Sequence, residues 1–366
     1  VLSQFMRRGV PAELRSQVWS RCLALEDVPC RVAQHEPPGW AAQQIDVDVP
    51  RTFSTWAAFQ EAERPEQLRR ALLAFASENP DIGYCQSLNL VAAVFLVVLD
   101  SEQAVPTSMR RLLDVLGARE WYKEGMRQLH ADALVLKDLM REHTPILFGA
   151  LQAHGFEPIF VCPRWFLSMF TVVLEGEGLL RIWDVVVADG IEAMFRVALA
   201  LLARREDDIV RARSLEDLLE MLLVPQVGLD VDTLLAIAYH PDLCLRRSQI
   251  ERQRDQALRQ LQSGSTASSA VDSAKALAPY LFAHYTRGVM AQGRERRGGE
   301  PGGAYRVGDF TRGLVSKSRG LLPEGSVGEV ARGLVAKLSA RGREPGADDA
   351  KELVGMSASA SKDKAP

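Results

Sequence analysis

The chain has little cysteine for its length, and its five cysteines (Cys22, Cys30, Cys85, Cys162 and Cys244) form no Cys-x-x-Cys pair. Such a sparse, odd-numbered set is typical of a reducing compartment and offers no metal-ligand spacing. The six histidines are equally scattered and form no His-Glu-x-x-His motif, so neither a metal centre nor a histidine-based catalytic site is expected. A Gly-rich phosphate loop ending in Gly-Lys-Ser or Gly-Lys-Thr is also missing, so we do not expect the chain itself to bind a nucleotide.

Long apolar runs are missing as well. The longest, Leu88 to Leu99, is shorter than the roughly 20 residues that a membrane-spanning helix needs, so no such helix is expected. A net charge of -3 and a pI of about 6.2 argue against a surface built as a whole to bind nucleic acid. Hydrophobic residues make up 47% and charged residues 25%, which is enough to bury a sizeable core.

Apolar residues recur at helical spacing through most of the chain. Leu68, Leu72 and Phe75 share one face of a helix that Asn79-Pro80 ends, because proline disfavours the helical conformation in the residue before it. The run Leu88–Leu99 is apolar on nearly every side, which predicts a central, buried helix. Further helices are predicted over Phe166–Val173, Ala193–Ala203 and Leu215–Val224. The β-branched run at 185–187 is too short to indicate a strand, so the predicted fold class is all-α.

The composition changes near residue 263. Residues 263–273 are small and polar, as in a flexible linker. We therefore assign 246–285 to C-terminal helices with a Ser-rich linker, and 286–366 to a low-complexity tail. The tail carries 15 basic and 10 acidic residues, a net charge of +5, and is rich in Gly, Ser and Ala. One interpretation is a disordered tail with short nascent helices, and the other is binding to a membrane surface or protein through basic segments with an apolar face.

Three short stretches in the first quarter of the chain carry candidate functional residues. In the first, Pro11 suits a helix start, and Arg15 and Trp19 lie four apart on one helix face. The simplest interpretation of this pair is an arginine stacked on a tryptophan.

The second stretch runs from Ile45 to Phe53. Asp48 and Arg51 lie three apart, so the carboxylate could hold the guanidinium in one orientation, whereas a plain surface salt bridge is the alternative. Pro50 indicates an irregular turn or a helix start at this point.

The third stretch, Asn79 to Asn89, is rich in turn-forming residues and leads into the apolar helix. Gly83 permits a positive φ or a close backbone approach, and Tyr84 and Gln86 follow it. A glutamine can orient a water because its amide donates and accepts hydrogen bonds at once. In the structural interpretation, Tyr84 packs its ring and Gln86 caps the helix.

In this order, the stretches resemble the TBC (Tre-2/Bub2/Cdc16) domain of Rab GTPase-activating proteins. The family motifs R-x-x-x-W, I-x-x-D-x-x-R and Y-x-Q are similar to Arg15–Trp19, Ile45–Arg51 and Tyr84–Gln86. A later stretch containing Arg181, Trp183 and Asp184 resembles the family's R-[IL]-W-D motif. The resemblance covers roughly residues 5–245, which we assign as the Rab-GAP TBC domain. One departure is Ser87, because the family often has glycine after the glutamine.

The resemblance implies a protein that accelerates GTP hydrolysis by a GTP-bound Rab-type GTPase and has no covalent chemistry of its own. Residue by residue, it implies that Arg51 is an arginine finger and Gln86 a glutamine finger, both supplied in trans. Asp48 would orient Arg51, Tyr84 would support the glutamine loop, and Ile45 and Asn89 belong to the same motifs. Arg15, Trp19, Arg181, Trp183 and Asp184 would be scaffold.

GTP and Mg²⁺ would belong to the partner, and the chain would be cytoplasmic with peripheral visits to endomembranes. Ser87 leaves open the alternative of a catalytically weak Rab-binding scaffold with the same fold. A helical adaptor unrelated to GTPases is a third possibility, but it does not explain why the arginine and glutamine stretches occur together.

Overall fold

The computed structural model describes residues 2–26, 36–53, 56–59, 61, 63–226 and 228–263. Every regular element in these residues is a helix and none is a strand, which confirms the predicted all-α class. Residues 264–366, which hold the rest of the segment assigned to 246–285 and the whole 286–366 tail, lie outside the described residues. The α-helices are α1 (Leu2–Arg8), α2 (Ala12–Cys22), α3 (Gly39–Asp48), α4 (Arg64–Glu78), α5 (Leu88–Leu99), α6 (Ala104–Leu116), α7 (Arg127–His143), α8 (Pro145–Ala153), α9 (Cys162–Phe166), α10 (Gly176–Asp189), α11 (Ile191–Ala203), α12 (Glu206–Arg211), α13 (Leu215–Leu223), α14 (Val231–Ala238) and α15 (Arg247–Ser263).

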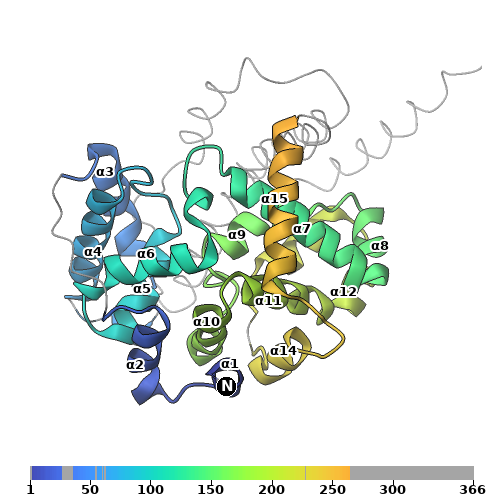
Figure 1. The fold of residues 1–366 in the computed structure, drawn as a ribbon, viewed down its shortest axis with the longest axis horizontal. Helices are drawn as coiled ribbons and strands as arrows, with labels where there is room; N and C mark the ends of the chain where they lie inside the picture. The colour runs from blue at the N-terminus through green and yellow to red at the C-terminus, as the bar shows by residue number, and fades with distance from the viewer. Residues whose placement is uncertain are drawn as a thin grey trace, which may run out of the picture.

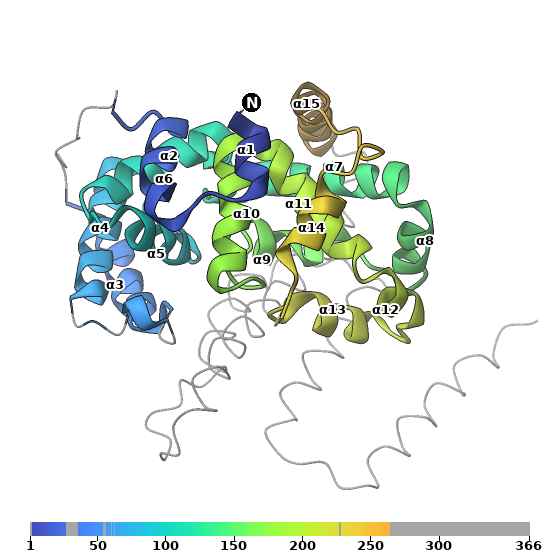
Figure 2. The ribbon, with the colours of Figure 1, turned by 90° about the horizontal axis from the view of Figure 1, so that it is seen from below.

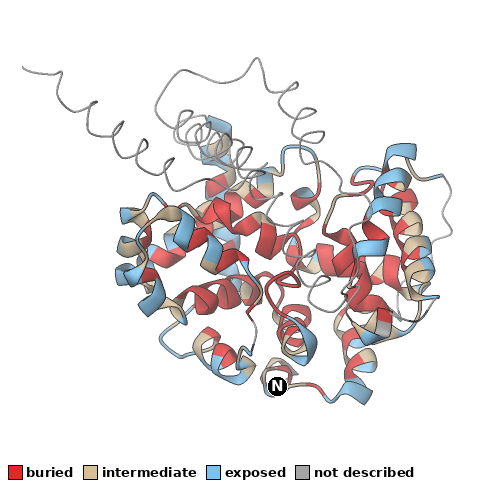
Figure 3. Cartoon of the chain, turned by 180° about the vertical axis from the view of Figure 1, so that it is seen from behind, coloured by how far each residue is buried: buried red, intermediate tan, exposed pale blue. Residues whose placement is uncertain are grey.

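Helices α2 to α6 form one side of the molecule in Figure 1, and α7, α8, α11, α12, α14 and α15 form the other, with α9 and α10 between them. Turned by 90°, the same division is visible in Figure 2, where α1 lies against α10. Buried residues line the inward sides of the helices on both sides of the molecule (Figure 3). Helix α10, which packs against α2 of one group and against α11 and α14 of the other, thus connects the two helical groups into one body.

Helix α4 follows the predicted pattern. Leu68, Leu72 and Phe75 are fully buried on one face, as their spacing indicated. The helix ends at Glu78, and the N–H of Asn79 still donates to the carbonyl of Phe75. Pro80 then prevents a further turn, because it has no N–H to donate.

Helix α5 is the apolar centre of the first group. It spans Leu88–Leu99 as predicted, residues 88–96 are buried, and it packs against α2, α4 and α6. No single described helix is long and apolar enough to cross a membrane; by length and composition alone, only the sharply bent pair of α5 and α6 passes that test. Both helices are core elements of this fold.

The helix predicted over Phe166–Val173 is wrong. Helix α9 ends at Phe166, and residues 167–173 form turns in which Met169 and Phe170 have φ of 49° and 66°. These two side chains are fully buried, and the carbonyls of Leu167 and Met169 accept hydrogen bonds from Tyr122 and Trp183. The turns bury the apolar side chains and satisfy the carbonyls, so tertiary packing overrides the helical periodicity.

The other helix predictions are confirmed. Helix α11 covers the predicted helix Ala193–Ala203, and α13 covers the predicted helix Leu215–Val224 up to Leu223. The β-branched run at 185–187 lies inside α10. Pro11 directly precedes α2, where its missing N–H leaves no hydrogen bond unmade.

Candidate functional site

Arg51 is presented by a change of helix type. Helix α3 ends at Asp48, and Val49–Arg51 continue it as one turn of 3-10 helix with Pro50 in its first turn. Pro50 has no N–H for the next α-helical bond, which explains the tightening at this point. Arg51 is exposed, and its side chain forms no hydrogen bond or ion pair with another described residue. Its guanidinium is therefore available to a ligand.

Asp48 does not hold Arg51 as an ion pair, contrary to the prediction. The side chain of Asp48 lies on the inner side of α3, where its Oδ2 accepts hydrogen bonds from Tyr84 Oη at 2.8 Å and from Gln44 Nε2 at 3.3 Å. The 3-10 turn carries Arg51 outward while Asp48 stays 4% exposed. Burial raises the pKa of Asp48 above its ordinary value, although the two donors and the nearby charge of Arg51 favour the ionised form.

Thr52 is a site residue that sequence reasoning missed. Its Oγ1 donates to the carbonyl of Asp48 at 2.8 Å and accepts from Asn89 Nδ2 at 2.8 Å. Asn89 in turn accepts from the backbone N–H of Ser87 at 3.1 Å through its Oδ1. The only signal in the sequence is that Thr52 directly follows Arg51, and its partner is 37 positions away.

The structure brings the second and third stretches together. Asp48 and Thr52 flank Arg51, and their partners Tyr84 and Asn89 flank Gln86. Two buried hydrogen bonds thus join the segment of Arg51 to the segment of Gln86. Gln86 itself is half-buried and Arg51 is exposed, so neither residue is fully enclosed in the core. Ile45 is fully buried beneath them and serves as core.

The backbone around Gln86 is held in an unusual conformation. Gly83 has φ of 60° and Ser87 has φ of 91°, values that favour glycine. The ring of Trp40 on α3 lies so close to Gly83 that a Cβ there would approach it to 2.8 Å. Cys85 lies between Gly83 and Ser87 in the sequence. Burial raises the pKa of its thiol to about 12, so this cysteine stays protonated at neutral pH.

Asp81 fixes the start of the same loop. Its carboxylate pairs with Arg119 at 3.0 Å and with Lys123 at 3.1 Å. Burial alone would raise the pKa of Asp81, but these two cations lower it below its ordinary value. The loop is therefore anchored to the 3-10 helix Arg119–Trp121 at one end and to α3 in its middle.

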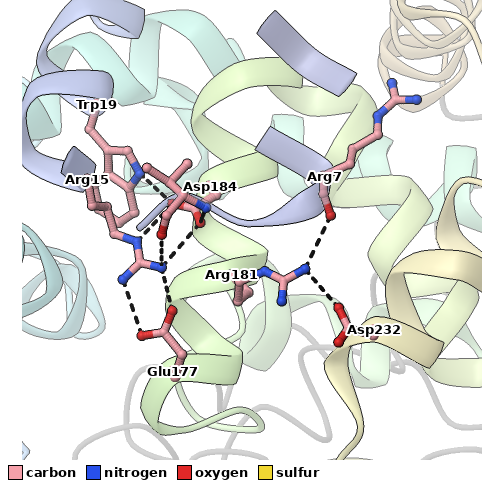
Figure 4. Close-up of polar contacts among 8 residues, drawn as sticks. Arg7, Arg15, Trp19, Glu177, Arg181, Asp184 and Asp232 are labelled. Carbon is pink, nitrogen blue, oxygen red and sulfur yellow. Dashed lines mark hydrogen bonds and ion pairs between the residues drawn. The ribbon is translucent and has the colours of Figure 1, made fainter. Parts of the chain in front are cut away.

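The remaining motif residues form a second cluster, shown in Figure 4. Asp184 on α10 is fully buried and accepts from Arg15 Nε at 3.0 Å, from Trp19 Nε1 at 2.8 Å and from the N–H of Val10 at 3.2 Å. Burial alone would lower the pKa of Arg15, but Glu177 and Asp184 raise it, so the arginine stays charged. The expected stacking of Arg15 on Trp19 is replaced by their shared bonds to Asp184.

Two further contacts complete this cluster. Trp19 stacks on Trp183 with ring centroids 5.8 Å apart, and Arg181 donates to the carbonyl of Arg7 and to Asp232 (Figure 4). These contacts join α1, α2 and α14 to α10. Within the described residues, no group of three or more His, Cys, Asp or Glu side chains is placed to hold a metal ion.

Comparison with known proteins identifies the family. The model of the Rab-GTPase-TBC domain matches residues 12–210, more than half of the chain. The chain belongs to the Rab-GTPase-TBC domain family. The matched range includes Arg15, Trp19, Arg51, Gln86 and Asp184.

Several curated relatives belong to the same family. TBC1 domain family member 2A of Mus musculus is 35% identical over 235 residues, covering 60% of this chain and 25% of that protein. Growth hormone-regulated TBC protein 6 of Caenorhabditis elegans is 33% identical over 220 residues, covering 60% of this chain and 66% of that protein. The chain thus spans about a quarter of the length of the member 2A relatives.

Two solved structures share the fold. The Chlamydomonas flagellar RabGAP TBC domain is 25% identical, with a TM-score of 0.56, over 65% of this chain and 83% of that one. The Ypt/Rab-GAP domain of Gyp1p is 18% identical, with a TM-score of 0.55, over 65% of this chain and 90% of that one. At this identity, the second likeness supports the fold alone.

Proposed function

We propose that this protein accelerates GTP hydrolysis by a GTP-bound Rab-type small GTPase, with Arg51 and Gln86 acting in trans. Membership of the Rab-GTPase-TBC domain family supports a role of the Rab-GAP type. The observation that carries the finer proposal is the pair of buried hydrogen bonds, Tyr84–Asp48 and Asn89–Thr52, that joins the segments of the two residues. These bonds support a partner that meets both segments at once.

Arg51 would stabilise charge on the transferring phosphoryl group. In phosphoryl transfer, charge spreads over the equatorial oxygens, and an arginine supplied in trans is worth about 10³–10⁵ in rate. At about 1.36 kcal/mol per factor of ten, this corresponds to roughly 4–7 kcal/mol of the barrier. Because Arg51 has no ion-pair partner among the described residues, it has no bond of this kind to give up when it reaches the phosphate.

Gln86 would orient the attacking water. Its amide can accept a hydrogen bond from the water and donate one to a phosphate oxygen. The turns at Gly83 and Ser87 and the bonds of Tyr84 and Asn89 restrict the loop, so the amide is pre-positioned before the partner arrives. Asp48 contributes by binding Tyr84 rather than by pairing with Arg51.

The nucleotide and its Mg²⁺ belong to the partner in this proposal, and the chain supplies no cofactor. The partner is the GTP-bound state, because only that state presents the phosphoryl group that Arg51 would contact. Since such GTPases are tethered to membranes, we place the protein in the cytoplasm with peripheral visits to endomembranes.

Substitution of each residue tests the proposal in a single-turnover assay with a panel of GTP-loaded Rab proteins. Arg51→Lys keeps the charge but loses the planar fork, and Gln86→Ala loses the amide, so each is expected to remove most of the stimulation. Binding of the GTP-loaded Rab should survive in both variants. Arg141→Lys, an exposed arginine of α7, is the matched control and should stimulate like the wild type.

Full stimulation by Arg51→Lys would contradict the role of the arginine. An unchanged rate with Gln86→Ala would mean that the GTPase's own glutamine orients the water.

A second candidate is a Rab-binding scaffold with weak catalysis. The observation that favours it is Ser87, whose φ of 91° strains a non-glycine residue next to Gln86. Binding of a GTP-loaded Rab without faster release of phosphate by the wild type would favour this candidate.

A further inference from the structure

We propose that the exposed face of α3 formed by Trp40 and Val47 is the surface on which the GTP-bound GTPase docks, with Trp40 as its apolar anchor. This inference rests on the proposed function and adds to it the residues that would supply affinity. The occupant is an apolar patch beside the nucleotide pocket of the GTPase.

The first argument is the exposure of two apolar side chains on one helix face. Trp40 is 58% exposed and Val47 is 45% exposed, and Trp40 is the most exposed aromatic residue in the described part of the chain. They lie seven positions apart, which places both on one face of α3. The same helix buries Ala41, Ile45 and Asp48 on its other face, so the exposure is not due to a loosely packed helix.

The second argument is continuity with Arg51. Arg51 follows Val47 by four positions, and the 3-10 turn that carries Arg51 extends α3 directly. From Trp40 to Arg51 the chain advances roughly 17 Å at about 1.5 Å per residue. A standard interface buries about 800 Å² on each partner, which is a disc of roughly 16 Å radius. An interface of this size centred on α3 midway between Trp40 and Arg51 therefore covers both residues, each about 8 Å from its centre.

The third argument is the contact of Trp40 with the glutamine loop. Its ring lies against Gly83, three residues before Gln86. Trp40 thus bridges the helix that leads to Arg51 and the loop that carries Gln86. A tryptophan held by a contact on one side and open on the other is the kind of residue that dominates binding energy in interfaces.

The charges near this face leave it open to an apolar partner. Asp46 is engaged by Arg69 at 2.7 Å, and Asp48 is buried. Arg51 is the cation of this face without an ion-pair partner among the described residues, and it would be neutralised by the phosphate. Docking would therefore not leave an unpaired carboxylate of α3 beneath the partner.

The test uses the full chain and the Rab protein that the wild type stimulates most. Trp40→Ala should raise KM at least about tenfold, the cost typical of an anchor residue. Affinity for the GTP-loaded Rab, measured in an Arg51→Ala background that slows turnover, should fall by the same factor. Ile146→Ala, which removes a side chain 73% exposed on α8 in the other helical group, is the matched control and should change neither value.

A second variant separates docking from support of the loop. Val47→Gln does not touch Gly83 and adds no charge beside Arg51, and its amide lies in water, so folding is expected to be unchanged in thermal unfolding. Under a docked apolar surface that amide would lose its hydration, so KM should rise and affinity fall while kcat stays.

Two outcomes would overturn the docking face. Unchanged KM and affinity in both variants would overturn the docking face. A fall in kcat at constant KM for Trp40→Ala would also overturn it and make Trp40 a positioning residue of the loop. Loss of the proposed function is read separately, from the Arg51 and Gln86 variants. If the wild type binds a GTP-loaded Rab without stimulating it, the affinity measurements still test the docking face.

Discussion

At the scale of single residues, the feature with the clearest energetic consequence is the backbone of Ser87. Its φ of 91° and ψ of -23° lie in the left-handed region, which costs a non-glycine residue about 1–2 kcal/mol. The side chain makes no capping hydrogen bond at the start of α5 that would offset this cost. The resemblance to the family places glycine at this position.

Ser87→Gly is therefore expected to stabilise the protein by up to about 1 kcal/mol, because the relief of strain exceeds the added entropy of an unfolded glycine. For a protein of this size, at roughly 2.1 cal/mol/K of unfolding entropy per residue, that is a rise in Tm of up to about 1–2 °C by calorimetry. Ser87→Ala keeps the strain and is the control, expected within about 0.5 kcal/mol of the wild type. A lower Tm for Ser87→Gly than for Ser87→Ala would contradict the strain argument.

The site shows what a sequence can tell at this scale. The stretches around Arg51 and Gln86 could be found, because each has a local pattern of residue types. The partners within the site could not, since Asp48 binds a tyrosine 36 positions away instead of the arginine three positions away. Likewise, the bond of Thr52 to Asn89 depends on how two segments pack. Spacing along the chain shows which pairs can meet but not which of them form.

At the scale of elements, α3 combines a buried carboxylate with an exposed docking face. Because burial raises the pKa of Asp48, the folded protein holds its proton more tightly than the unfolded chain does. The group therefore favours folding at low pH, and this contribution is lost as the pH rises through the folded-state pKa.

Asp48→Asn should remove this dependence and keep an oxygen that accepts from Tyr84. Relative to the wild type, the variant is expected to gain free energy of unfolding as the pH rises from about 4 to 7, followed by urea unfolding. Asp46→Asn, which removes a carboxylate from the exposed side of the same helix, is the control for the loss of one charge. The opposite result is a wild type whose free energy of unfolding rises relative to that of Asp48→Asn as the pH rises. It would mean that the interactions of Asp48 with Tyr84, Gln44 and Arg51 lower its pKa by more than burial raises it.

Elements were predictable where one strong local signal decided them. Helix α5 matches its apolar run, and α4 stops where Asn79-Pro80 requires it. The prediction failed over residues 167–173, where the apolar residues are buried from turns. There the carbonyls of Leu167 and Met169 are satisfied by Tyr122 and Trp183, which lie on other elements. A periodic pattern cannot distinguish this arrangement from a buried helix.

At the scale of the whole molecule, α15 joins the two helical groups. Arg254 is 9% exposed in its side chain, and its Nε donates at 2.7 Å to Asp132 of α7, which is fully buried. The same guanidinium donates to the carbonyls of Leu116 and Gly117 at the end of α6. Helix α6 belongs to the group that carries the candidate site, and α7 to the other (Figure 1). One side chain therefore ties the two groups together.

Arg254→Met should cost about 3–5 kcal/mol, because it leaves the charge of Asp132 buried without its cation. The measurement is urea unfolding, with Arg247→Met as the control. Arg247 lies on the same helix and also reaches the end of α6, at Val115, but its side chain is 53% exposed, so its loss should cost less than about 1 kcal/mol.

The stimulated rate of Arg254→Met, per folded molecule and at a temperature where it stays folded, should equal that of the wild type. The bonds Tyr84–Asp48 and Asn89–Thr52 lie wholly within residues 48–89, and none of them passes through α15. A rate that falls in the folded fraction would mean that the relative placement of the two groups also sets the geometry of Arg51 and Gln86. In that case the site would be a property of the whole helical body, and not of α3 and the loop before α5 alone.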